Sequence, residues 1–309
     1  MTQRTLCGQM AKGFVGFEER SLQANGLSHR VLAWSPTAPL RDAAPASTVV
    51  LVHGLMDAAG SWDRVAPVLA AVGYRVFAPD MRGFGDGGRA PSGSYYHFSD
   101  YVADLAALVE VLSPGEPVAL VGHSMGGTIT TLYAGAFPER VARLASLEGL
   151  GPPDNAWEVG PIRMRRWIEG VRALRQKGEP PLLTREEAFQ RLAVSHPIVP
   201  REILEHRFEH LVHVVTDADG TERVQWRFDP LHRTTAPVPF FAKLFVEFAK
   251  RVTCPVLFIS GGASGFHVPD EEERLAAFSA LERAAFEGAG HMIHWTQPDE
   301  LAARLVAFL

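Results

Sequence analysis

Residues 118–127 have the sequence Val-Ala-Leu-Val-Gly-His-Ser-Met-Gly-Gly. The branched apolar residues that open this stretch predict a buried strand, and the chain that follows it can continue as a helix. Gly122 and Gly126 have the Gly-x-Ser-x-Gly spacing of a nucleophile elbow, a tight turn that forces the serine into a strained backbone conformation. The pattern predicts that the Ser124 hydroxyl stands at the tip of the strand, beside the free N–H groups of a helix N-terminus.

Length, composition and charge narrow the class of protein. The chain has 309 residues, of which 47% are hydrophobic and 21% charged. These values predict a globular protein with one large domain, or one domain that carries an insertion. The net charge of −5 argues against nucleic acid or an anionic membrane as the main partner. Cys7 and Cys254 have no metal-ligand spacing, so we expect free thiols, no metal and no cofactor, although a disulfide between them stays open.

We expect no secretion signal in the N-terminal segment. Met1 to Phe14 lacks the apolar segment of a signal peptide, and the chain has no run of about 18 apolar residues. We therefore expect a cytoplasmic protein without stable membrane insertion. Its oligomeric state is expected to be a monomer or a homodimer.

Strands and helices alternate along most of the chain. Besides the strand before Ser124, strands are expected at 14–21, 27–34, 48–52, 74–78, 141–147, 256–260 and 284–287. Helices are expected at 61–71 (with Ser61 as N-cap), 98–112, 125–137, 270–280 and 298–309. The first two strands form an antiparallel hairpin, and the alternation that follows predicts a mainly parallel sheet with right-handed crossovers.

One long segment breaks this alternation. Helices are expected at 162–176, 184–195 and 200–211, and a small hairpin at 214–228, with several tryptophan and phenylalanine residues among them. We interpret 154–251 as an inserted, mainly helical cap. The core domain is then formed by 1–153 and 252–309.

A serine nucleophile needs a base, an orienting acid and donors for the oxyanion. The candidate base is His291, which lies in a glycine-rich turn between the last strand and the closing helix; His294 on the same loop is the competitor. Two backbone N–H groups are candidates for the oxyanion hole. Met125 directly follows the serine, and Leu55 follows the end of a buried strand.

Four stretches together resemble the α/β-hydrolase fold serine hydrolases. They are Leu51-Val52-His53-Gly54, Asp80-Met81-Arg82-Gly83-Phe84-Gly85, Gly122-His123-Ser124-Met125-Gly126-Gly127, and Gly290-His291-Met292 with Gln297-Pro298. The resemblance covers nearly the whole chain outside the cap. It implies an α/β-hydrolase fold, with a mostly parallel sheet flanked by helices and an inserted cap, and a triad in which the acid lies between the serine and the histidine in sequence. It also implies that Asp80 and Arg82 brace the sheet.

The triad acid departs from the common pattern of this family. Most members carry an aspartate shortly after the strand at 256–260, but this chain has no carboxylate there before Asp270. A minority, including some haloalkane dehalogenases and the serine-hydrolase-like proteins, take the acid from the end of the strand after the elbow helix, where this chain has Glu148. A buried carboxylate is costly without a partner, and a histidine would supply one. We hypothesise that Glu148 is the acid, with Asp270, Asp154 or no functional acid as alternatives.

These residues predict a carboxylic ester hydrolase that works through an acyl-enzyme. The expected substrate is a small to medium, largely apolar molecule, and the same triad also suits a thioesterase, a lactonase or a carbon–carbon bond hydrolase. A low-turnover ligand-binding protein on the same fold is the alternative from another class. The serine nucleophile, in place of aspartate, argues against epoxide hydrolase or dehalogenase chemistry.

Hydrolase sites are mostly apolar, so side chains next to the motifs are candidates to line the substrate pocket. These candidates are Met56, Trp62, His123, Trp157 and Trp295.

Overall fold

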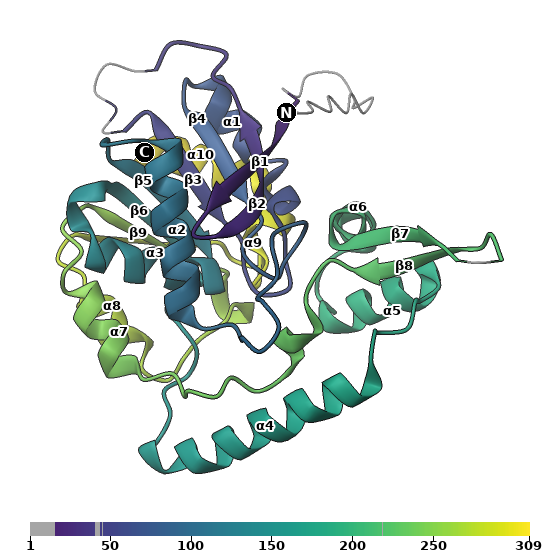
Figure 1. Ribbon diagram of the computed structural model, residues 1–309. Helices are drawn as coiled ribbons and strands as arrows, with labels where there is room; N and C mark the ends of the chain where they lie inside the picture. Colours follow the sequence, from purple (N-terminus) through teal and green to yellow (C-terminus); the bar gives the residue numbers. More distant parts are fainter. Residues whose placement is uncertain (1–15, 41–43, 45, 218) are drawn as a thin grey trace.

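An eight-stranded sheet runs through the core (Figure 1). The computed structural model describes residues 16–40, 44, 46–217 and 219–309. The strands are β1 (Glu18–Ala24), β2 (Leu27–Trp34), β3 (Thr48–Val52), β4 (Arg75–Pro79), β5 (Val118–His123), β6 (Val141–Leu147), β9 (Val256–Ser260) and β10 (Leu281–Ala285). Their spatial order is β1-β2-β4-β3-β5-β6-β9-β10, antiparallel up to β4 and parallel from there on. The prediction of a mostly parallel sheet is confirmed.

Helices cover both faces of this sheet. One face carries α2 (Phe98–Leu112), α3 (Met125–Ala136), α7 (Ala242–Ala249) and α8 (Glu271–Ala276), and the other carries α1 (Ala66–Ala71) and α10 (Pro298–Phe308). Side chains of a strand alternate between the two faces. In β3, Val50 and Val52 pack on the first face, and Val49 and Leu51 on the second. All four are fully buried, which is why the strand has an unbroken apolar sequence.

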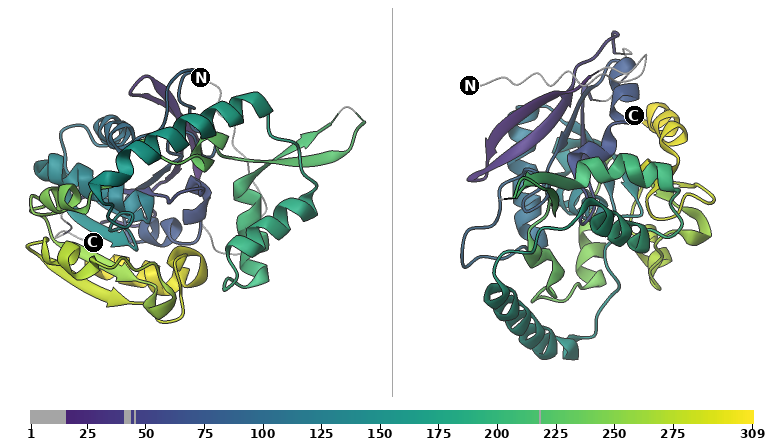
Figure 2. Two further views of the ribbon diagram at one scale, coloured as in Figure 1. Left: turned by 90° about the horizontal axis from the view of Figure 1, so that it is seen from below. Right: turned by 90° about the vertical axis from the view of Figure 1, so that its right-hand side faces the viewer.

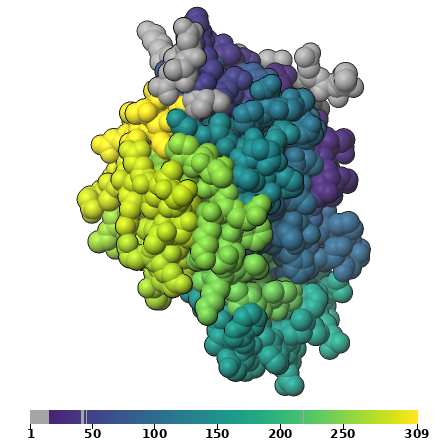
Figure 3. All heavy atoms as spheres, turned by 90° about the vertical axis from the view of Figure 1, so that its left-hand side faces the viewer, coloured from purple at the N-terminus to yellow at the C-terminus, as the bar shows by residue number. Residues whose placement is uncertain are grey.

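The segment after β6 leaves the core and forms a separate layer (Figures 1 and 2). It contains α4 (Gly160–Lys177), α5 (Arg185–Ser195), α6 (Arg201–Leu211) and a hairpin of β7 (Val212–Thr216) and β8 (Glu222–Trp226). In Figure 3 the teal helix α4 forms the lower end of the molecule. The α5, α6 and hairpin elements share a small core with Met292 and Trp295, two residues that follow His291.

The two ends of this segment lie side by side. The Ala242 backbone N–H donates to Asp154 Oδ1 at 2.7 Å, and the Asn155 side chain donates to the Phe240 carbonyl at 3.0 Å. Directly afterwards, α7 packs against α3 of the core and buries Phe245 there. We therefore propose that the cap ends near residue 241, ten residues before the end of the range 154–251 deduced from the sequence.

Some element boundaries differ from those expected. Ser61 is not a helix N-cap: it lies within a short 3-10 helix at Ala59–Trp62, and α1 begins at Ala66. Its hydroxyl donates instead to Asp57. The strand β10 begins three residues before the expected start at 284, because its charged, half-exposed residues give a weak pattern. Within the part of the chain that the structure describes, Cys254 is a free, buried thiol, whereas Cys7 and the segment up to Phe14 lie outside that part.

The turn after β4 ties the hairpin, the sheet and α2 together. Asp80 accepts hydrogen bonds from the backbone N–H groups of Ala59 (2.7 Å) and Asp86 (3.0 Å). Arg82 donates from Nε and Nη2 to both oxygens of the buried Asp104, each at 2.5 Å. These contacts give Asp80 and Arg82 the bracing positions that the resemblance implies.

Asp104→Ala is expected to lower the free energy of unfolding by about 2–3 kcal/mol, because it leaves the Arg82 guanidinium without its bidentate partner. The loss is smaller than for a wholly buried pair, since Asp100 lies 3.9 Å from Arg82 and the guanidinium touches solvent. Urea unfolding measures it. The control is Glu272→Ala, which breaks an exposed ion pair with Arg283 and should leave the free energy of unfolding unchanged. Equal stabilities of the two variants would contradict the bracing role.

A histidine links the cap to the same turn. The His232 ring stacks on Phe84 with centroids 4.0 Å apart and lies 4.1 Å from the Tyr96 ring. Burial lowers the pKa of His232 to about 4. The imidazole is therefore neutral in the folded protein over the physiological range, and the unfolded chain takes up its proton first as the pH falls.

The lowered pKa of His232 makes the folded protein less stable as the pH falls. The stabilisation is fully present above the unfolded pKa of about 6.5 and is lost as the pH falls from there toward 4. Between pH 7.5 and pH 5, His232 should account for a loss of about 2 kcal/mol in the free energy of unfolding. His232→Phe keeps a stacked ring but has no group that titrates in this range. Between pH 7.5 and pH 5 its free energy of unfolding should therefore fall by about 2 kcal/mol less than that of the parent protein, as measured by urea unfolding. Equal losses in both proteins would refute this account.

Candidate active site

The turn between β5 and α3 has the conformation of a nucleophile elbow. Ser124 has φ 52° and ψ −115°, a left-handed conformation that a residue with a side chain rarely adopts. Glycines make the turn fit. A Cβ on Gly122 would lie 2.6 Å from the Gly127 nitrogen, and one on Gly126 would lie 2.7 Å from the His53 carbonyl oxygen. The turn therefore needs glycine at both positions, and it holds the serine between strand and helix.

Three side chains from different parts of the chain meet at this turn. His291 Nε2 lies 3.0 Å from Ser124 Oγ, and His291 Nδ1 lies 3.2 Å from Glu148 Oε2. Ser124 and the histidine are half-buried, whereas the Glu148 side chain is fully buried. The order serine, histidine, carboxylate is the arrangement needed to activate a hydroxyl.

The Glu148 carboxylate is held by the loop that follows β9. The backbone N–H of Gly261 donates to Oε1 at 2.5 Å, and the Phe266 N–H donates to Oε2. Gly265 provides the room, because a Cβ there would collide with the carboxylate. Glu148 itself adopts a left-handed conformation, with φ 54°. The loop after β9 thus supplies two amides to a carboxylate from the neighbouring strand, which satisfies a buried charge.

The alternative residues lie elsewhere. Asp270 pairs with Arg274, with Oδ1 2.8 Å from Nη2, and Asp154 accepts a hydrogen bond from the Ala242 N–H. His294, the competitor for the base, places Nε2 3.1 Å from Asp57 Oδ2 and is fully buried. The structure therefore brings Glu148 and His291 to the serine, and none of these three residues.

Backbone N–H groups lie open beside the serine. Met125 is the first residue of α3, so its N–H has no carbonyl one turn earlier in the helix. Leu55 belongs to the turn after β3, and its N–H has no backbone partner among the described residues. Gly54 approaches the serine closely, since a Cβ there would lie 3.3 Å from Ser124 Cβ. Met125 thus follows the serine directly, and Leu55 follows a glycine that packs against it.

The five pocket candidates divide into two groups. Trp62, His123 and Trp295 are buried, with at most 1% of each residue exposed, so they form walls and core beneath the site. Met56 and Trp157 are exposed, and Trp157 stacks on Phe241 at 4.1 Å in the cap. None of the buried three has the open surface that a substrate needs.

The buried residues join a polar network that sequence reasoning missed. Asp57 binds His294, accepts the Ser61 hydroxyl through Oδ1, and faces His123 across the cluster. His123 Nε2 donates to the His291 carbonyl at 2.7 Å. Burial and the nearby rings of His294 and His291 hold the pKa of His123 well below its usual range. The network therefore supports the backbone of His291 from behind with a neutral imidazole.

Apolar side chains surround the serine on the open side. Phe266 is 41% exposed and lies edge-on to the His291 ring at 5.6 Å. Ile198 from the cap occupies the space beside Gly290, where any side chain at that glycine would stand. Leu55 and Met56 are exposed on the turn after β3. The elements on the open side of the site therefore offer apolar side chains.

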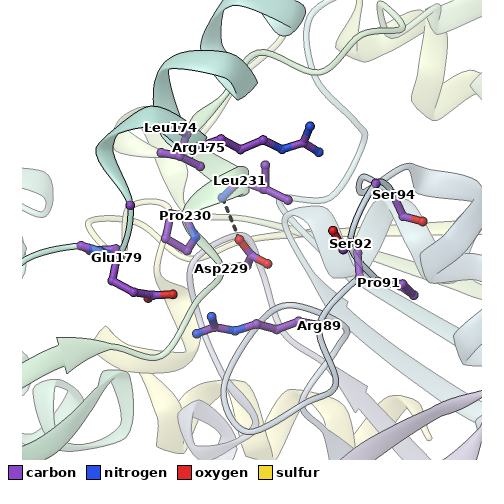
Figure 4. Close-up of a pocket in the computed structure, with 14 residues that line it drawn as sticks. Arg89, Pro91, Ser92, Ser94, Leu174, Arg175, Glu179, Asp229, Pro230 and Leu231 are labelled. Carbon is purple, nitrogen blue, oxygen red and sulfur yellow. Dashed lines mark hydrogen bonds between the residues drawn. The ribbon is translucent and has the colours of Figure 1, made fainter.

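A separate cavity of about 450 Å³ lies between cap and core (Figure 4). It is bounded by the loop at 89–94, the end of α4 and the segment at 229–231. Arg89 and Arg175 reach toward it from opposite sides, and Asp229 holds the Leu231 N–H at 2.9 Å. Neither Ser124 nor His291 lines this cavity.

Comparisons with known proteins agree with the fold described above. A family model described as the alpha/beta hydrolase fold matches residues 47–298. Epoxide hydrolase A of Mycobacterium tuberculosis is 28% identical over 94% of this chain and 97% of its own length. A serine hydrolase-like protein of Dictyostelium discoideum is 25% identical over 90% of this chain and 78% of its own length. The crystal structure of a hypothetical protein from Pseudomonas aeruginosa PAO1 has a TM-score of 0.77 at 28% identity, and covers 94% of this chain and 96% of that one.

Among the described residues, no helix is both long and apolar enough to cross a membrane. The match of the family model spans most of the chain, and its fold agrees with the parallel sheet and the elbow. This chain belongs to the α/β-hydrolase fold family and is a hydrolase of that family.

Proposed function

We propose that this protein hydrolyses carboxylic esters through an acyl-enzyme on Ser124. One observation carries the proposal: His291 lies between the serine and Glu148, with its two ring nitrogens 3.0 Å and 3.2 Å from their oxygens. A histidine held in this way can remove a proton from the hydroxyl and return it to a leaving group.

The reaction follows from these positions. Ser124 Oγ attacks the acyl carbon while its proton passes to His291 Nε2, and Glu148 stabilises the imidazolium through Nδ1–H. The N–H groups of Leu55 and Met125 hold the negative oxygen of the tetrahedral intermediate. His291 then protonates the alcohol as it leaves. Water attacks the acyl-serine by the same route, and the acid product departs.

The substrate class follows from the surroundings of the serine. Phe266, Ile198, Leu55 and Met56 offer apolar surface near the reacting atoms, which favours a largely apolar acyl or alcohol group. The similarity to an epoxide hydrolase does not extend to the chemistry proposed here. Epoxide opening through an alkyl-enzyme uses a carboxylate nucleophile, and this chain has a serine at the elbow.

A fluorophosphonate probe should label the protein at one site, because it reacts with serines activated by a histidine. Ser124→Ala should abolish the label, and should lower kcat/KM for p-nitrophenyl esters of graded chain length by about 10⁴-fold or more. The mass of the labelled peptide identifies the modified residue. Ser264→Ala changes a serine of the neighbouring loop and should leave the label intact. An intact protein that is never labelled would contradict the proposed serine chemistry.

Glu148→Gln should lower kcat for the best ester by about 10²- to 10⁴-fold with little change in KM, because the amide no longer stabilises the imidazolium. Asp270→Asn is the matched control. It neutralises the competing carboxylate, which pairs with Arg274 in the structure, and should retain most of the turnover. Steady-state kinetics of both variants decide between them. The reverse result, with Asp270→Asn inactive and Glu148→Gln active, would make Asp270 the acid.

A further inference from the structure

Two histidines of the cap face one carboxylate of the core. His206 and His210 lie one turn apart on α6, so their side chains share a face of the helix. Asp63 follows the short helix at Ala59–Trp62 in the core. Its Oδ2 lies 2.6 Å from His206 Nε2 and 3.2 Å from His210 Nε2, so both rings converge on the same oxygen.

The spacing of these atoms suits a metal ion. Imidazole nitrogens and carboxylate oxygens bind zinc at roughly 2.0–2.2 Å in a tetrahedron, which places neighbouring ligand atoms about 3.3 Å apart. The His210 distance already has this value, and the His206 ring needs to move by about 0.7 Å. All three ligand atoms lie within 4.8 Å of one another. Two histidines four residues apart on a helix, joined by a carboxylate, form a common zinc ligand set.

A second contact orients the carboxylate. Arg207, which is 1% exposed, donates from Nη1 to Asp63 Oδ1 at 2.6 Å. The guanidinium thus occupies one oxygen and leaves Oδ2 directed at the two histidines. Carboxylates that bind metals are usually held by hydrogen bonds of this kind. Arg207 is buried where α6 meets the core, so its contact with Asp63 also fixes α6 on the core.

The site is open to solvent on one side. The His206 and His210 side chains are 42% and 24% exposed, which gives an ion a path of entry and leaves room for a water as fourth ligand. The cluster of Asp57, His123 and His294 differs in this respect. Its members are wholly buried and already bonded beneath the active site.

We propose that Asp63, His206 and His210 bind a transition-metal cation, with zinc the best match to their chemistry, and that the ion fastens the cap to the core. Nitrogen and carboxylate ligands in tetrahedral spacing favour zinc over magnesium or calcium, which take oxygen ligands. The ion would link α6 to the segment at 57–62, whose Asp57 and Ser61 hold His294 and Trp295 beside the active site. Metal occupancy would therefore stabilise the arrangement of cap and core seen in this structure. This inference does not depend on the proposed ester hydrolysis.

Metal binding is tested on the full-length chain without an affinity tag, after removal of metal with a chelator. Titration calorimetry with zinc should show one site per chain, and cobalt should give the intense visible absorption of a tetrahedral complex. Zinc at a hundredfold excess over its Kd should raise Tm by roughly 4 °C. These readouts require no enzymatic activity.

The variants separate a metal site from ordinary hydrogen bonds. In the double variant His206→Gln and His210→Gln, the amides still donate to Asp63 but do not bind zinc well, so the protein should keep its metal-free Tm and lose the zinc response. His213→Gln is the control, because this histidine joins cap to core through Asp86 at 3.1 Å, outside the proposed site. The proposal is overturned if the parent binds no stoichiometric zinc, or if the double variant binds zinc as the parent does.

Discussion

The backbone of Ser124 is the constraint on which the site depends. A residue with φ 52° directly after a strand turns the chain so sharply that the following helix must pass over the neighbouring strand, β3. The helix comes so close that only glycine fits at 122 and 126. The same approach sets the first N–H of α3 next to the turn after β3. One strained residue therefore brings together the serine and the backbone donors that flank it.

The carboxylate of Glu148, the proposed acid, is a buried charge that two neighbouring strands hold together. Glu148 ends β6, and two N–H groups of the loop after β9 hold its carboxylate. The loop has glycine at 265 where a side chain would collide with that carboxylate. The two N–H donors and the glycine at 265 are thus two aspects of one arrangement, because a carboxylate in this place needs donors and space.

The parts that were predictable from sequence are those with strong local patterns. β3, β5 and β9 are buried on both faces, so their apolar sequences were unbroken, and the elbow was marked by its glycines. Glu148 could be found because a carboxylate after an apolar strand needs an explanation. β10 was misplaced because Glu282 and Arg283 interrupt its pattern. Asp57 and His294 lie 237 residues apart, and no local pattern reports a pair that only the fold brings together.

The hydrogen bonds between residues 154–155 and 240–242 have a consequence for how this protein can change over evolution. Because of these bonds, the chain leaves the core and returns to it at one place on the core surface. A segment whose two ends are already joined adds no long loop for the core to close, so its length and content can vary at little cost to the sheet below. The hydrolase core can in this way keep one set of reacting groups while the cap above it is replaced by another.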